Sequence, residues 1–407
     1  SVTNSWRNWI EFEKAFQKKN IENLKQRKIS NDELITDKVL GGVSFAYHDK
    51  KRNKIYVAVN YPGKIPHIAE LDLESGRIKR LKDVKGPTLF NFTSLTYDEK
   101  NDLLFYTTDN DDKRDLNVYN LSTGQSKRLQ KDCRIGDLAF NKADESLWGV
   151  KHLNGISTLV KIPKTVPGKP TAQNYSTWEQ KYTLPYGSDM FDMDISPDGL
   201  SLSAGFTDIN GNQFLNIYEL ESFKSFEKDS IKFKEVFNFE VASPQSFKFS
   251  EDGSYLLGSS YYTGVSNIYK VDSNTLDIEI LTNALTGYFR PIPIDEEKIF
   301  SFKYTSDGFV PVYVYNEENI EVSSIEFLGN RTVEKHPELK SWTTDVPNIG
   351  NFDDESLNAK KGIYIPRKEI KLTYAYPTII GYKNKFGLGY KFKFQDPIGL
   401  KTLDLSL

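Results

Sequence analysis

A short pattern of alternating large residues recurs six times along the chain, roughly every fifty residues, and limits the folds that this sequence can adopt. In each copy two large residues stand at alternate positions, and a polar or turn-forming pair such as Asn-Lys, Ser-Pro or Asp-Glu follows them. Because side chains alternate between the two faces of a strand, this spacing predicts a β-strand in each copy. The six copies are Ser44–Asp49, Ser94–Glu99, Asp137–Lys142, Asp192–Pro197, Ser246–Glu251 and Pro291–Glu296.

Each copy continues into further short strands. In the fourth copy, Ser196-Pro197-Asp198-Gly199 precedes a second strand, and Leu215-Asn216-Ile217-Tyr218 follows as a third. Proline fixes φ, aspartate bonds the nearby backbone and glycine accepts a positive φ, so this string predicts a tight turn. Repeats of about 40 to 50 residues with four strands each are typical of the blades of a β-propeller. We therefore expect an all-β fold, a six-bladed β-propeller over residues 39–335.

Composition agrees with one large soluble β domain and excludes several function classes. The 407 residues are 38% hydrophobic and 27% charged, enough for an ample core under a charged surface. A net charge of −3 provides no basic field for nucleic acid or an anionic membrane, so nucleic acid is not expected as a partner. The single cysteine, Cys133, excludes an internal disulfide and a cysteine-cluster zinc site, and we expect it to be a small buried side chain.

An amphipathic helix is expected before the propeller, with a linker, over residues 1–38. Residues 4–27 place large apolar side chains at steps of three and four, and Asn4 or Ser5 can cap the start. We expect this apolar stripe to pack on the propeller or on a preceding domain, rather than on a membrane surface. The stripe consists of Trp6, Trp9, Ile10, Phe16, Ile21 and Leu24.

A different alternation occupies the end of the chain, over residues 336–407. A polar connector leads into a run from Tyr374 to Leu407, in which large apolar side chains alternate with glycine and lysine across the turn Asp396-Pro397-Ile398-Gly399. The pattern is typical of a hairpin at the start of an outer-membrane barrel, and the alternative is an extra hairpin that covers a propeller edge. On one face we expect Phe386, Leu388, Tyr390, Phe392 and Phe394.

The string Ile195-Ser196-Pro197-Asp198-Gly199, with the Asn-x-Tyr strand after it, resembles the repeat of TolB-type propellers, which also occurs in relatives of prolyl oligopeptidase. Ser5–Ile10, Asn60-Tyr61-Pro62-Gly63 and Tyr304–Pro311 extend the resemblance to bacterial outer-membrane proteins. In those proteins a gluzincin-like peptidase domain precedes a TolB-type propeller, and a surface-antigen type barrel follows it. The resemblance implies that this chain is the propeller fragment and that peptidase activity belongs to an upstream domain. It also implies a location in the cell envelope, either in the periplasm or in association with the outer membrane.

The sequence contains few candidate motifs for catalysis or for metal binding. No His-Glu-x-x-His zinc motif occurs, and the two nearest approaches to a Gly-x-Ser-x-Gly elbow lack the final glycine. We therefore expect no catalytic residues and no cofactor in this chain. Asp109, Asp111 and Asp115 could ligate calcium through hard carboxylate oxygens, although a solvated turn needs no metal.

Charged residues of the inner strands are the candidate binding site. The repeat alignment places five of them near the propeller axis: Asp137, Asp192, Asp194, Lys248 and Arg290. Charges there could hold a polar ligand or a peptide terminus, or they could pair with one another or face water. We expect a non-catalytic binding or scaffold domain that interacts with a protein or peptide and orients a neighbouring peptidase domain of the same polypeptide. Membrane contact is expected only through the barrel. The alternative is a propeller enzyme, a lactonase or polysaccharide lyase, with a metal in the channel.

Overall fold

The computed structural model describes residues 2–61, 63–84, 94–109, 114–164, 175, 177–224, 231–316, 321–322, 324–325, 328–342, 362–382 and 385–407. Two compact units divide the chain, Ser1–Val346 and Pro347–Leu407. Each unit is described separately below.

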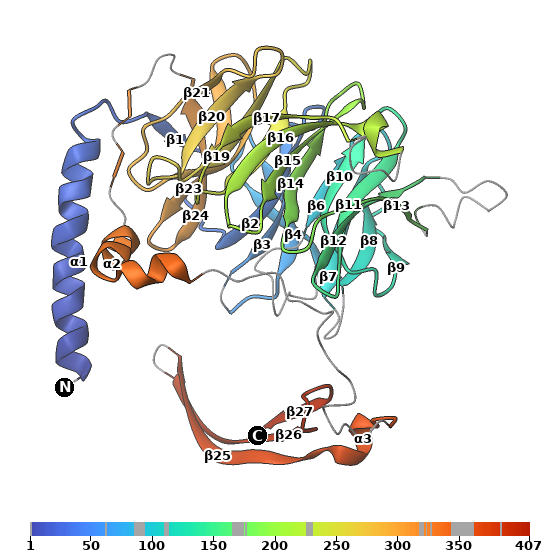
Figure 1. The fold of residues 1–407 in the computed structure, drawn as a ribbon, viewed down its shortest axis with the longest axis vertical. Helices are drawn as coiled ribbons and strands as arrows, with labels where there is room; N and C mark the ends of the chain where they lie inside the picture. The colour runs from blue at the N-terminus through green and yellow to red at the C-terminus, as the bar shows by residue number, and fades with distance from the viewer. Residues whose placement is uncertain are drawn as a thin grey trace. The chain divides into compact units, whose positions relative to one another are not determined.

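Six four-stranded antiparallel sheets make up most of the first unit. Each runs from an inner to an outer strand, and Figure 1 shows them in chain order from blue to orange. The first three sheets, blades 1 to 3, contain β2 (Gly42–Asp49), β3 (Lys54–Asn60), β4 (His67–Asp72), β5 (Ile78–Asp83); β6 (Leu95–Asp98), β7 (Leu103–Asp109), β8 (Arg114–Asn120), β9 (Ser126–Gln130); β10 (Ile135–Asn141), β11 (Ser146–Leu153), β12 (Ile156–Ile162), β13 (Glu179–Thr183). Blades 4 to 6 contain β14 (Asp189–Ile195), β15 (Ser201–Thr207), β16 (Gln213–Glu219), β17 (Phe233–Asn238); β18 (Pro244–Phe249), β19 (Tyr255–Ser260), β20 (Asn267–Asp272), β21 (Ile278–Ile280); β22 (Tyr288–Pro293), β23 (Lys298–Thr305), β24 (Gly308–Tyr315), β1 (Asp32–Leu34).

The inner strands of these sheets form a closed ring. Each of β2, β6, β10, β14 and β18 contacts the inner strand of the next blade, and β22 contacts β2. Closed rings of four-stranded sheets are propellers, so the expected all-β propeller fold is confirmed, and the described residues of the first unit form six of these sheets. The repeats of the sequence therefore correspond to blades.

An N-terminal strand completes the last blade. β1 pairs with β24 in the register Glu33↔Tyr313, although the sequence placed these residues in a linker. The Asp32 carboxylate accepts hydrogen bonds from Tyr288 Oη at 2.7 Å and from Lys303 Nζ at 2.6 Å. The last blade therefore contains strands from both ends of the propeller sequence, and their pairing closes the ring.

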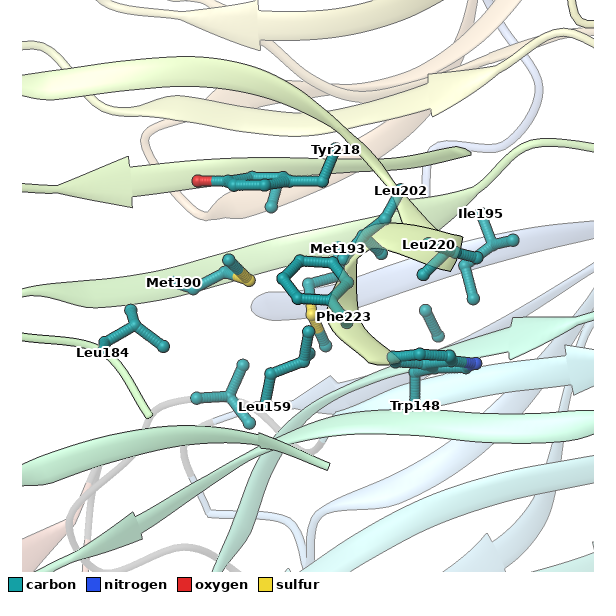
Figure 2. Close-up of a cluster of buried hydrophobic side chains, with 13 residues drawn as sticks. Trp148, Leu159, Leu184, Met190, Met193, Ile195, Leu202, Tyr218, Leu220 and Phe223 are labelled. Atoms are coloured by element: carbon teal, nitrogen blue, oxygen red, sulfur yellow. The ribbon is translucent and has the colours of Figure 1, made fainter. Parts of the chain in front are cut away.

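Large apolar side chains fill the wedges between neighbouring blades. Figure 2 shows the wedge between blades 3 and 4, where Phe223 packs against Trp148 and Tyr218. Phe223 comes from a 3₁₀ helix, Leu220–Lys224, in the connection between β16 and β17, and only 2% of its surface is exposed. This connection therefore supplies core to two blades at once.

The N-terminal helix α1 spans Val2–Leu24, close to the expected range. Its final turn packs on the propeller: Leu24 joins a buried cluster with strands of blades 5 and 6, and Asn283 Nδ2 donates to Leu24 O at 3.2 Å. The start of the stripe does not pack on the propeller, since Trp6 and Trp9 are 58% and 46% exposed and stack on each other, and its packing on a preceding domain stays a prediction. Periodicity places side chains on one helix face but does not say what covers that face.

Two short helices follow the last blade, α2 (Leu328–Lys335) and a 3₁₀ helix (Pro337–Ser341). None of the helices in the described ranges combines the length and apolar character that a bilayer-spanning helix needs.

The second unit contains a three-stranded antiparallel sheet. Its elements are α3 (Pro366–Glu369), β25 (Lys371–Tyr382), β26 (Lys385–Gln395) and β27 (Thr402–Ser406). The registers Ile379↔Leu388 and Phe392↔Leu405 put apolar residues of all three strands on one face, as the alternation predicted. This face is exposed within the unit: Phe386 and Leu388 are 80% and 74% exposed.

Candidate functional site

Bulges in the inner strands place the charged side chains of the site. The register shifts by one residue in β14, β18 and β22, and in each strand the first bulge residue has a positive φ: Asp192 (52°), Ser246 (55°) and Arg290 (55°). None of the three is glycine, and such conformations cost of order 1–3 kcal/mol each and gather at functional sites. The repeat alignment in the sequence equated Pro291 with Ser246. This was wrong, because the residue of β22 at the bulge position of Ser246 is Arg290.

The three bulge residues contact one another across three successive blades. Arg290 Nη1 lies 2.9 Å from Asp192 Oδ2 and donates a hydrogen bond to Ser246 Oγ. The backbone N–H of Ser246 donates to the same Asp192 oxygen at 2.9 Å. The Arg290 guanidinium also lies over the Phe45 ring, 4.8 Å from its centroid, so this one side chain links blades 1, 4, 5 and 6.

Asp137 adds a second carboxyl group beside Asp192. Its Oδ2 accepts a hydrogen bond from the Asp192 backbone N–H at 3.3 Å. Burial, and then the charge of Asp192, raise the pKa of Asp137 to about 7. The carboxyl group of Asp137 therefore holds a proton at pH values where an exposed aspartate is ionised.

Lys248 on β18 and Asp194 on β14 are the other two ionisable residues of the candidate site. Lys248 Nζ donates to the Ala46 carbonyl oxygen at 2.8 Å and lies 3.4 Å from the centroid of the Tyr47 ring. Burial lowers the pKa of Lys248 to about 7, and the charge of Asp194 opposes this shift. Asp194 Oδ2 accepts from the Phe249 N–H at 2.9 Å, and burial raises the pKa of Asp194.

An axial cavity of about 140 Å³ opens where the inner strands end. Residues of all six blades line it, among them Asp194 and Lys248. At the cavity Lys50 pairs with Glu251 at 2.6 Å, and Lys142 and Glu99 contribute further charges. The apolar and aromatic lining includes Tyr47, Phe140, Ile195, Pro197, Phe249, Pro291, Ile292 and Pro293.

The five charged residues proposed from the sequence thus all lie in inner strands. Hydrogen bonds link Asp137, Asp192 and Arg290, and Asp194 and Lys248 line the cavity. The sequence reasoning missed the lining residues Tyr47, Phe140, Ile195 and Phe249, which it recognised only as strand-forming alternation. Their signal was available: each is the second large residue of its repeat. His48, which follows Tyr47, also lines the cavity.

Two of the three aspartates proposed as calcium ligands bind other groups of the protein. Asp109 pairs with Arg114 at 3.1 Å, and Asp115 accepts from the Asp132 N–H at 2.9 Å; Asp111 lies outside the described residues. Over the ranges that the structure describes, no group of three or more His, Cys, Asp or Glu residues is arranged to hold a metal ion. The Cys133 thiol is buried and donates to Arg114 O at 3.2 Å.

Comparisons with family models and with curated proteins found no match. Similar solved structures include TolB from Acinetobacter baumannii, with 15% identity over 70% of this chain and 65% of that chain and a TM-score of 0.44. An oligogalacturonate lyase from Vibrio parahaemolyticus has 12% identity over 72% and 97% of the two chains, with a TM-score of 0.44. The PQQ-bound aldose sugar dehydrogenase from Streptomyces coelicolor has 11% identity over 71% and 99%, with a TM-score of 0.48. The fold assignment rests on the sheets and their ring, and no function of these proteins is transferred to this chain.

Proposed function

We propose that the propeller is a non-catalytic binding domain whose axial cavity takes a segment of a protein or peptide. One observation carries the proposal: one cavity is lined by residues of all six blades, and its lining combines apolar and aromatic side chains with the ionisable residues Asp194 and Lys248. Ligand sites in proteins combine apolar and aromatic side chains with fixed polar groups, and this cavity is lined by both kinds. As the sequence resemblance implies, the domain would also orient a neighbouring peptidase domain.

Peptide selection tests this proposal. A displayed library of random peptides is selected on the wild-type chain, and the affinities of the selected peptides are then measured for Lys142→Trp. Lys142 is an exposed residue that lines the cavity, so a bulky indole there should obstruct the entrance. We expect affinity to fall about tenfold or more, equivalent to about 1.4 kcal/mol.

Lys100→Trp is the matched control, because Lys100 is exposed on the same side of the ring but does not line the axial cavity. It should leave the affinity within about twofold of wild type. Equal losses in both variants, or no loss in Lys142→Trp, would place the peptide elsewhere. Peptidase or esterase turnover by the purified chain would contradict the non-catalytic role.

We also propose that the protein belongs to the bacterial cell envelope and that the apolar face of the β25–β27 sheet contacts lipid. The exposed large side chains on this face support the proposal, because exposed apolar patches mark surfaces for proteins or membranes. The wild-type chain should float with vesicles of phosphatidylethanolamine and phosphatidylglycerol. Leu388→Asp should reduce flotation severalfold, while Thr378→Asp, on the opposite face, should not; equal effects would contradict lipid contact by this face.

A further inference from the structure

Lys248 is held in an unusual position for a lysine. Most lysines extend their ammonium group into water, but Lys248 lies on the inner strand β18 and lines the axial cavity. Its Nζ is fixed between the Ala46 carbonyl oxygen, at 2.8 Å, and the face of the Tyr47 ring, 3.4 Å from the centroid. The position of the nitrogen is therefore set by two groups of blade 1.

A neutral amine can make both of these contacts. An uncharged lysine has two N–H bonds and one lone pair, whereas an ammonium has three N–H donors. One N–H is directed to the Ala46 oxygen and a second can face the Tyr47 ring as an N–H···π contact. In that form neither contact uses the lone pair of Nζ, and the side chain lines the cavity.

Charged groups from three blades surround this nitrogen. Asp194 and Asp192 of β14 favour the charged form, while Arg290 of β22 and Lys142, which follows β10, disfavour it together with burial. The balance lowers the pKa of Lys248 to about 7, so that a large share of the amine is neutral at pH 7 to 8. Burial and a neighbouring cation are the two means by which proteins make a lysine nucleophilic.

We propose that Lys248 is a nucleophilic amine that captures small aldehydes and ketones in the axial cavity as imines. The lone pair of Nζ attacks the carbonyl carbon and forms the C–N bond, and the carbonyl oxygen takes up a proton. The resulting carbinolamine loses this oxygen as water, and Nζ loses its hydrogens, so one molecule of water leaves for each imine formed. Asp194, which lines the same cavity and whose pKa is raised by burial, is the acid that supplies the proton.

Reductive trapping on the full wild-type chain tests the proposal. The chain is incubated briefly with propanal and sodium cyanoborohydride, which reduces an imine to N-propyl-lysine, and each lysine is quantified by peptide mass spectrometry. At pH 7 we expect Lys248 to react about tenfold faster than Lys232, a lysine with 74% of its side chain exposed. The rate at Lys248 should level off above pH 7, because its pKa is lowered to about 7.

Lys248→Arg should lose the fast reaction and leave the other lysines unchanged, with Lys232→Arg as the matched control. If Lys248→Arg does not fold, the comparison of Lys248 with Lys232 within the wild-type chain still tests the proposal. In urea the difference between Lys248 and Lys232 should disappear. Equal rates in the native chain, or a preference for Lys248 that survives unfolding, would overturn the proposal. The outcome is independent of the peptide experiment above.

Discussion

Arg290→Met is expected to lower the free energy of unfolding by about 3 kcal/mol at pH 8. The guanidinium is only 15% exposed, and it is the cation that pairs with Asp192, at 2.9 Å. Its removal leaves the Asp192 carboxylate in the channel next to Asp137, without a compensating charge. Breaking a buried ion pair on one side is costly because the remaining charge stays desolvated.

The cost of Arg290→Met should depend on pH. Because the folded-state pKa of Asp137 is raised to about 7, this carboxyl group is protonated in the folded chain at pH 5 and largely ionised at pH 8. A carboxyl group with a raised pKa stabilises the fold at low pH, and that contribution is lost as the pH rises from about 4 through 7. Repulsion between Asp137 and Asp192 is therefore smaller at pH 5, and the variant should lose less stability there.

Urea unfolding at pH 5 and pH 8 measures both effects. Arg80→Met is the control, since Arg80 and its partner Asp83 are 44% and 56% exposed, and an exposed pair contributes about 0–1 kcal/mol. A loss from Arg290→Met no larger than that of the control would contradict the buried ion pair. An equal loss at the two pH values would contradict the role given to Asp137.

Phe223→Ala is expected to destabilise the propeller by about 3–5 kcal/mol. Phe223 is 2% exposed, and its ring centroid lies 6.4 Å from that of Trp148 and 5.8 Å from that of Tyr218. Truncation opens a cavity in the wedge that Figure 2 shows between blades 3 and 4. The loss combines the removed apolar contact with the energy of that cavity.

Phe233→Ala is a matched control for this change. Its ring is also next to Tyr218, with centroids 5.4 Å apart, but the residue is 53% exposed. The control should cost less than about 1 kcal/mol, because little apolar area is removed from the interior. Similar losses in the two variants, measured by urea unfolding, would show that Phe223 does not fill the wedge.

The repeats allowed the ring to be predicted, because each blade carries its own alternation and turn. In blade 4, Gly199 has a φ of +74° and Asp198 Oδ1 accepts from the Leu200 N–H at 3.0 Å, as the turn string indicates. The closing strand β1 was missed for a physical reason. Its three residues, Asp-Glu-Leu, are too few and too polar to show an alternation, and β24 alone makes them a strand.

The charged residues of the site could be named from the sequence, but their contacts could not. Asp192 and Arg290 are 98 positions apart, and their pairing depends on bulges at non-glycine residues, which leave no local sequence signal. The contact of Lys248 with Tyr47 likewise joins blade 5 to blade 1 across the channel. Such contacts are set by closure of the ring rather than by neighbouring residues.

Photo-crosslinking of a selected peptide tests the central claim, that the axial cavity is the binding site, most directly. The peptide carries p-benzoylphenylalanine, and the crosslinked residues of the wild-type chain are identified by mass spectrometry. We predict crosslinks to cavity residues from several blades, namely Tyr47, Phe140, Ile195, Phe249 and Ile292. Crosslinks confined to outer strands such as β17, or to the β25–β27 sheet, would contradict the claim.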